Sequence, residues 1–225
     1  MSLPAGLYGP VVTRILYLHG FASSPRSSKA TFLGTRLVAC GAAFEAPDLN
    51  QPDFSTLTVT RMLGQVREIV DRQPEGPIAV VGSSLGGFVA VHAALQHPAR
   101  VERLVLLAPA LDFGGNRMPD GLGDRSLEDW KATGELNVFH HAYGRMGSVH
   151  YALYSDARQY DAQSAALDIP VQIFQGRRDA SVDPRTVERW AASRPNVELH
   201  LLDDDHQLTA SLDYIWEHIR RFLSL

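Results

Sequence analysis

The chain has 225 residues, of which 45% are apolar and 20% charged, values that are ordinary for a soluble globular protein and suit one domain over residues 1–225. Its formal net charge is −4 without a basic block, so we expect no nucleic-acid partner. One cysteine excludes an internal disulfide and favours a reducing compartment; with no recognisable signal peptide and no apolar run long enough to span a bilayer, we expect a cytoplasmic protein.

Short apolar runs alternate with longer amphipathic runs along the chain. The short runs predict strands at residues 12–18, 42–46, 78–81, 104–107, 171–174 and 197–202. The longer runs predict helices at residues 29–39, 57–72, 85–96 and 186–192, with a closing helix at 212–223. This alternation predicts an α/β fold, in which a mostly parallel sheet of about six or seven strands has helices on both faces.

Three residues in or near the first predicted helix allow predictions about their side chains. Cys40 lies in its apolar pattern, which favours a buried, inert thiol. Arg26 and Lys29, near the start of the helix, could meet an anionic substrate, but a solvated helix face is the role that we expect for both.

About sixty residues separate the strands at 104–107 and 171–174, which is too long for a structureless loop in a compact domain. We expect residues from about 112 to about 168 to form a small, partly helical cap over the carboxyl ends of the strands, where open α/β sheets bind ligands. Its apolar side chains either line an acyl pocket or form the cap's own core, and the core is the commoner fate of aromatic residues. The pocket candidates are Phe113, Met118, Phe139 and Tyr143.

A glycine–serine cluster follows the predicted strand at 78–81. Gly82-x-Ser84-x-Gly86 fits the nucleophile elbow, a sharp turn between strand and helix that exposes a serine hydroxyl. A glycine-rich turn can also cradle phosphate, but the chain lacks both the Gly-Lys-Ser/Thr ending and the Gly-x-Gly-x-x-Gly pattern of such sites. Ser84 is therefore predicted to be a covalent nucleophile.

A serine nucleophile needs a base, usually a histidine that a carboxylate orients. Asp179 follows the strand at 171–174 and His206 follows the strand at 197–202, so both should lie at the sheet edge that carries Ser84. Asp183 is the rival acid, although its place before Pro184 suits a helix N-cap better. No His, Asp or Glu cluster has convincing metal-ligand spacing, and we expect no metal.

Two backbone N–H groups are expected to bind the developing oxyanion. One belongs to Leu85, the residue after the nucleophile, and the other should come from the loop after an earlier strand. We select the N–H of Phe21, in the segment His19-Gly20-Phe21, as this second donor. The Phe21 ring could also form a wall of the acyl pocket. The alternative is that this segment is an ordinary connecting loop, and His19 is expected to shape it rather than to transfer protons.

With these pieces in place the chain resembles the α/β-hydrolase superfamily over essentially its full length. Two motifs are similar to those of small bacterial YqiA-like esterases and of a mitochondrial acyl-protein thioesterase branch: Tyr17-Leu18-His19-Gly20-Phe21-Ala22-Ser23-Ser24-Pro25-Arg26-Ser27-Ser28-Lys29-Ala30 and Val81-Gly82-Ser83-Ser84-Leu85-Gly86-Gly87. The resemblance implies hydrolysis of small acyl esters or thioesters by Ser84, Asp179 and His206 without a cofactor. The cap matches nothing in that pattern, so the substrate is not carried over.

Other functions stay open at this point. A serine triad on this fold also serves lipases, carbon–carbon bond hydrolases, perhydrolases and peptidases. A ligand-binding or signalling protein with weak turnover is a further alternative, because a fold does not determine a function. The sequence predicts no oligomeric state.

Overall fold

The structure, a computed structural model, describes residues 14–115 and 127–225. Six parallel strands form its main sheet in the order β2-β1-β3-β4-β7-β8. These strands are β1 (Arg14–Leu18), β2 (Ala43–Glu45), β3 (Ile78–Ser83), β4 (Val101–Leu107), β7 (Val171–Gly176) and β8 (Val197–Leu202). The predicted parallel α/β sheet is confirmed; residues 12 and 13 of the first predicted strand lie outside the described residues.

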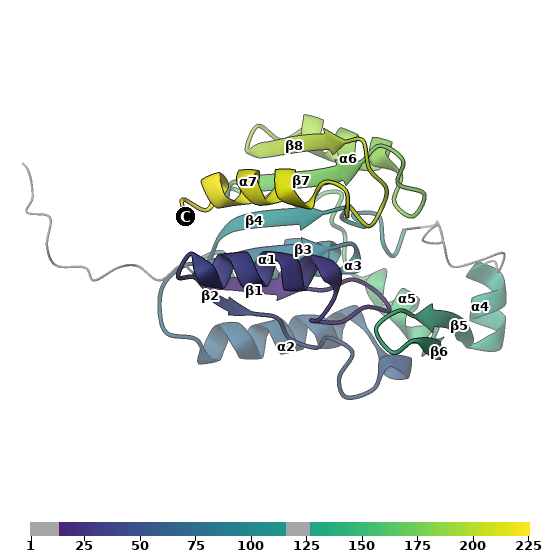
Figure 1. The fold of residues 1–225 in the computed structure, drawn as a ribbon. Helices are drawn as coiled ribbons and strands as arrows, with labels where there is room; N and C mark the ends of the chain where they lie inside the picture. The colour runs from purple at the N-terminus through teal and green to yellow at the C-terminus, as the bar shows by residue number, and fades with distance from the viewer. Residues whose placement is uncertain (1–13, 116–126) are drawn as a thin grey trace, which may run out of the picture.

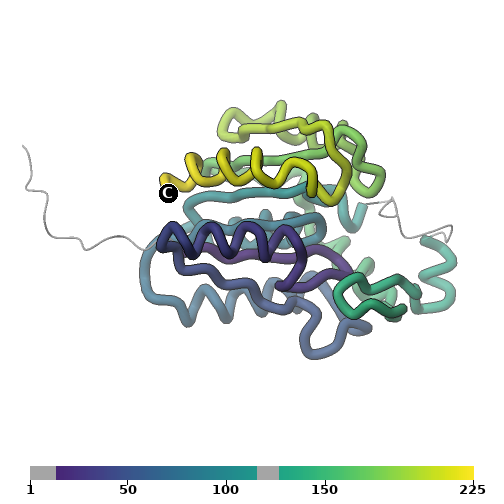
Figure 2. Tube along the Cα trace, viewed as in Figure 1, coloured from purple at the N-terminus to yellow at the C-terminus, as the bar shows by residue number. Residues whose placement is uncertain are grey.

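Helices cover both faces of the sheet, as predicted (Figures 1 and 2). Side chains alternate between the two faces of a strand, and in β1 Ile15 and Tyr17 belong to one buried cluster while Leu16 and Leu18 belong to the other. The first cluster packs against α1 (Ser28–Ala39) and α7 (Leu212–Phe222). The second packs against α2 (Val59–Arg72), α3 (Leu85–Gln96) and α6 (Pro184–Ala192). The sheet is thus buried on both sides.

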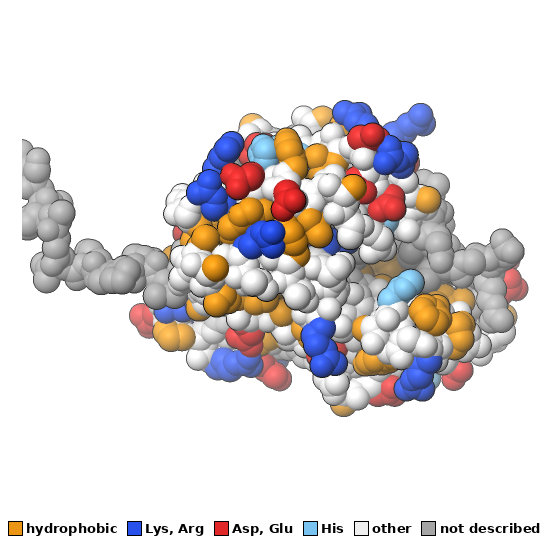
Figure 3. Space-filling model, in the orientation of Figure 1, with side chains coloured by type: hydrophobic (Ala, Val, Ile, Leu, Met, Phe, Trp, Pro, Cys, Tyr) orange, Lys and Arg blue, Asp and Glu red, His pale blue; other side chains and the backbone are white. Residues whose placement is uncertain are grey.

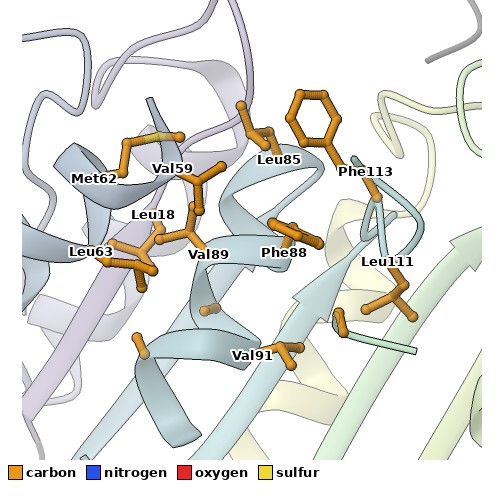
Figure 4. Close-up of a cluster of buried hydrophobic side chains, with 14 of the residues drawn as sticks. Leu18, Val59, Met62, Leu63, Leu85, Phe88, Val89, Val91, Leu111 and Phe113 are labelled. Atoms are coloured by element: carbon orange, nitrogen blue, oxygen red, sulfur yellow. The ribbon is translucent and has the colours of Figure 1, made fainter. Parts of the chain in front are cut away.

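The helix α3 begins directly after Ser84 and is almost entirely buried. Its residues from Leu85 to Ala94 are all buried. Figure 4 shows Met62 and Val59 of α2 beside it, and Phe113 on its other side. The rings of Phe88 and Phe113 meet edge to face with centroids 5.9 Å apart. This packing fixes the helix that begins directly after Ser84.

Side-chain caps explain where several helices begin. Ser27 accepts a hydrogen bond from the Ala30 N–H at the start of α1, and Asp183 accepts one from the Arg185 N–H at the start of α6. Thr58 caps α2 in the same way. That helix begins two residues later than predicted, because a short 3₁₀ turn, η1 (Phe54–Thr56), precedes it.

The cap elements lie between β4 and β7 in the chain and beyond the carboxyl ends of the strands (Figure 1). They are α4 (Leu127–Thr133), β5 (Glu135–His140), β6 (Arg145–His150) and α5 (Ala152–Ala157). The two strands form an antiparallel hairpin, which the prediction of a partly helical cap did not include. Trp130 of α4 is buried against Tyr151 and Tyr154, so part of the cap's aromatic content forms its own core.

Two side-chain predictions for the first helix are wrong. Cys40 is exposed, because it is the C-cap of α1 and Gly41, at φ +84°, turns the chain away from the helix. Lys29 is buried rather than solvated, with 6% of its surface exposed, whereas Arg26 is exposed. Of the helices in the described parts of the chain, none is both long and apolar enough to cross a membrane.

Candidate active site

Ser84 lies in a sharp turn between β3 and α3. Its backbone adopts φ 52° and ψ −119°, a conformation that L-residues rarely adopt. The turn is held because the Ser84 N–H donates to the Leu107 carbonyl at 2.9 Å and the Ser84 carbonyl accepts from the Ala110 N–H at 3.1 Å. The end of β4 and the segment that follows it therefore hold the strained residue on both its N–H and its carbonyl, and Ser84 lines the cavity described below.

The glycines on either side of Ser84 allow this turn to pack closely. A Cβ atom at Gly82 would lie 2.4 Å from the Gly86 carbonyl oxygen, and a Cβ atom at Gly86 would lie 2.1 Å from the Leu18 carbonyl oxygen. Both contacts are with backbone atoms, which cannot move without displacing β1 or α3. The requirement for glycine at both positions agrees with the elbow motif.

The Gly86→Ala variant should therefore be destabilised. We expect a loss of about 3 kcal/mol in the free energy of unfolding, at the upper end of overpacking effects, measured by urea denaturation. Gly64→Ala in α2 is the matched control, because a methyl group there would meet no atom within 4 Å. The control should be neutral or gain up to about 1 kcal/mol from helix propensity. Equal urea midpoints for Gly86→Ala and the wild type would contradict this packing.

The structure brings Ser84, His206 and Asp179 together in one chain of hydrogen bonds. His206 Nε2 lies 3.1 Å from Ser84 Oγ, and His206 Nδ1 lies 2.8 Å from Asp179 Oδ2. The three residues follow β3, β8 and β7, and they meet because parallel strands end at the same edge of the sheet. With its proton on Nδ1, the neutral imidazole donates to Asp179 and accepts from the Ser84 hydroxyl.

Asp179 is held rigidly as a carboxylate. Its side chain is fully buried, and burial by itself raises the pKa of a carboxyl group. The hydrogen bond and charge of His206, with further hydrogen bonds from the Val182 N–H and from Gln175, outweigh burial and lower the pKa of Asp179 below its ordinary value. Asp179 Oδ1 also accepts from the Ser181 N–H at 2.8 Å.

Gln175 is a site residue that the sequence analysis missed. Its Nε2 donates to Asp179 Oδ2 at 2.8 Å, beside the bond from His206. It lies inside the buried strand β7, one residue before its end and four residues before Asp179, and a polar residue in such a strand was the available signal. Asp183, the rival acid, instead caps α6.

The loop after β1 lies against the turn that carries Ser84. A Cβ atom on Gly20 would stand 3.1 Å from the Ser84 Cβ, which shows how closely the two segments approach. His19 shapes this loop as expected: its Nδ1 donates to the Gly20 carbonyl at 2.9 Å, and its Nε2 accepts from the Leu49 N–H at 3.0 Å. In the cap, the His141 N–H donates to the carbonyl of Ala22 at 3.0 Å. The hairpin therefore braces the loop that carries Phe21.

Phe21 and Leu85 both line the cavity beside Ser84. The Leu85 N–H belongs to the first residue of α3 and has no acceptor within that helix. Among residues 14–115 and 127–225, no backbone carbonyl accepts a hydrogen bond from either N–H group. The positive end of the α3 dipole lies at the Leu85 N–H and favours an anion there.

A cavity of about 990 Å³ opens onto Ser84 and His206. Its walls are largely apolar on the side of the cap, where they include Phe113, Trp130, Val138 and Leu153. The start of α1 and the loop before it provide a polar side with four serines, Arg26 and Lys29. The cavity is therefore shaped for a molecule with one apolar and one polar part.

The predicted pocket residues lie in different places. Phe21, Phe113 and Phe139 line the cavity, although Phe139 is 50% exposed. Tyr143 stacks on His140 and faces a second, shallower groove, and Met118 lies outside the described residues. Figure 3 shows apolar side chains gathered over the cap, where Phe139, Tyr143 and Met146 are exposed. In the described segments no group of three or more His, Cys, Asp or Glu side chains could hold a metal ion.

Several known proteins are similar to this chain in sequence, in fold or in both. Lipase LipV of Mycobacterium tuberculosis is 34% identical over 142 residues, covering 56% of this chain and about half, 53%, of LipV. Palmitoyl-protein thioesterase ABHD10, mitochondrial, of Mus musculus is 32% identical over 212 residues, covering 88% of this chain and 70% of the relative. The structure of alpha/beta hydrolase domain-containing protein 10 from mouse is similar with a TM-score of 0.78 at 24% identity, covering 97% of this chain and 92% of that chain.

The relatives with curated functions include a lipase and a thioesterase. The structural similarity confirms the predicted α/β-hydrolase fold. The model of the uncharacterised protein family UPF0227 matches residues 14–224, so the chain belongs to this family.

Proposed function

We propose that the protein is a serine hydrolase that cleaves carboxylic ester or thioester bonds of small acyl substrates through an acyl-enzyme intermediate. The observation that carries the proposal is the hydrogen-bonded chain from Ser84 through His206 to Asp179 at the floor of a partly apolar cavity. The names of the relatives, a lipase and a palmitoyl-protein thioesterase, support the same class of reaction.

In the first half of the reaction, His206 Nε2 takes the proton of the Ser84 hydroxyl as Oγ attacks the acyl carbonyl carbon. The carbonyl oxygen gains the negative charge, and the N–H groups of Phe21 and Leu85 stabilise it. Losing one such donor typically costs about 3–4 kcal/mol of transition-state stabilisation. The imidazolium then protonates the leaving alcohol or thiol, which departs and leaves the acyl group on Ser84.

In the second half, water enters and His206 takes one of its protons as the oxygen attacks the acyl-enzyme. The tetrahedral intermediate collapses, Ser84 Oγ regains the proton from His206, and the carboxylic acid leaves. Asp179 keeps the His206 proton on Nδ1 and stabilises the imidazolium. Because Gln175, Ser181 and Val182 also hold the Asp179 carboxylate, the orientation of the imidazole does not depend on the substrate.

The intermediate can be tested by trapping the acyl group. Matched pairs of p-nitrophenyl esters and N-acetylcysteamine thioesters, each pair with the same acyl chain, are hydrolysed in water with added methanol. A common acyl-enzyme gives the same ratio of methyl ester to free acid from both members of a pair. A ratio that depends on the leaving group, or no turnover of either series, would contradict the proposal. The chain-length series also measures how long an acyl group the cavity accepts.

The location of the protein stays a prediction. The sequence favours the cytoplasm, while the mouse relative is described as mitochondrial. The predicted absence of a nucleic-acid partner is likewise untested by the structure.

A further inference from the structure

Lys29 is a buried cation next to the proposed active site. The mechanism above gives it no role. It lies in the first turn of α1, beside the loop that joins β8 to α7 (Figure 1). Only 6% of its surface is exposed, although lysine is almost never fully buried without a partner. Its Nζ donates a hydrogen bond to the backbone carbonyl of His206 at 3.3 Å, across 177 residues of sequence.

The partners of Lys29 explain why its burial is tolerated. The carboxylates of Asp179, Asp205 and Asp204 attract the ammonium group. Burial, the largest effect, lowers the pKa of Lys29 to about 8, and the three carboxylates oppose that change. The side chain therefore carries its charge at neutral pH, when the hydrogen bond to His206 is charge-assisted.

The loop that carries His206 is held by hydrogen bonds on both sides of that residue. Asp204 accepts from the Asp205 N–H at 2.8 Å and the Ser211 N–H at 2.9 Å, and Asp205 accepts from the Gln207 N–H at 2.8 Å and the Leu208 N–H at 3.3 Å. Within residues 14–115 and 127–225, no hydrogen bond to the His206 carbonyl is recorded other than the one from Lys29. Lys29 thus fixes the peptide group from which the imidazole projects.

We propose that Lys29 is a positioning residue for His206, an inference that rests on the proposed function. It holds the His206 carbonyl, and this contact fixes the peptide group from which the imidazole reaches Ser84 Oγ and Asp179 Oδ2. Without the contact, the imidazole would spend less time at the position from which it takes the Ser84 proton.

The test compares three variants at position 29 with one control. Lys29→Met removes the charge and the donor, Lys29→Gln removes the charge and keeps a donor, and Lys29→Arg keeps both. Lys131→Met, at an exposed position in α4, controls for the loss of a lysine. The kcat and the KM of an activated ester are measured separately at neutral pH, and active-site titration with a fluorophosphonate corrects each preparation for misfolded protein.

Losing the donor should let the imidazole move away from Ser84, so the loss should fall on kcat rather than on KM. Lys29→Met should lose about tenfold or more in kcat, as for a lost hydrogen bond to a charged group, while its KM should stay within about twofold of the wild-type value. Lys29→Gln should lose less, because it keeps a donor. Lys29→Arg and Lys131→Met should keep kcat close to that of the wild type.

The outcomes separate this inference from the proposed function. A wild-type protein that neither hydrolyses esters nor reacts with the fluorophosphonate would overturn the proposed function. An active wild type whose kcat is matched by that of Lys29→Met, or a Lys29→Arg that loses as much kcat as Lys29→Met, would overturn the role of Lys29 alone. If Lys29→Met does not fold, Lys29→Gln replaces it, and a Lys29→Gln whose kcat equals that of Lys29→Arg would overturn the role.

Discussion

The Ser84→Ala variant is expected to lose between about ten-thousandfold and a millionfold of the kcat for activated esters, the range found when serine hydrolases lose their nucleophile. Of the hydroxyl groups in the described residues, that of Ser84 lies within hydrogen-bond reach of His206 Nε2, at 3.1 Å, where its proton can be taken as it attacks a carbonyl. The fold should be unaffected, because the Ser84 side chain makes no capping hydrogen bond to α3. Steady-state kinetics and a thermal melt of the same preparation measure both quantities.

Ser83→Ala is the matched control for this variant. Ser83 is the neighbouring residue, is buried and lines the same cavity, but it makes no hydrogen bond with His206. Its removal should change kcat by less than about tenfold, the effect of one ordinary hydrogen bond. Retention of more than a tenth of wild-type kcat by Ser84→Ala would exclude Ser84 as the nucleophile.

The Asp179→Asn variant is expected to lose about ten-thousandfold in kcat, the size seen when the triad carboxylate becomes an amide. The amide nitrogen can only donate, so His206 would present an unprotonated Nδ1 to it and carry its proton on Nε2, facing Ser84. Gln175 already donates to the same oxygen, which leaves the new amide without a good orientation. Asp183→Asn, in the N-cap of α6, is the control and should keep its activity.

The same carboxylate makes stability depend on pH. Because the pKa of Asp179 is lowered in the folded protein, its contribution to stability is fully present above the unfolded-state pKa and is lost as the pH falls through the lower, folded value. The urea midpoint of the wild type should therefore decrease below about pH 4, and that of Asp179→Asn should decrease less over the same interval. Parallel curves for the two proteins would contradict this environment of Asp179.

The sheet could be predicted from the sequence because its strands are nearly continuous apolar runs between amphipathic helices. The order of Ser84, Asp179 and His206 at strand ends also predicted which residues meet, since parallel strands share one carboxyl edge. The β5–β6 hairpin was not predicted. Its buried face alternates through Leu136, Val138 and His140, and the polar third member hides the period of two.

The other features that were not predicted depend on contacts between residues far apart in the sequence or on the direction of a turn. Lys29 is buried by a loop 177 residues away, whereas a lysine in the first turn of a helix is normally solvated. Gln175 reaches Asp179 only because the chain turns back after β7 through Gly176. In the cap, Tyr143 faces a separate groove because the hairpin turn points it away from the cavity. No local pattern encodes these placements.

The most direct measurement is covalent labelling with a fluorophosphonate followed by intact mass spectrometry and peptide mapping. We predict a single adduct on the peptide that contains Ser84, no adduct on the Ser84→Ala protein, and slow labelling of His206→Ala, which lacks the base. Ser83 lies on the same peptide, so fragment ions assign the modified serine. An unlabelled wild type, or an adduct on Ser83 or any other residue, would contradict the assignment of Ser84 as the nucleophile.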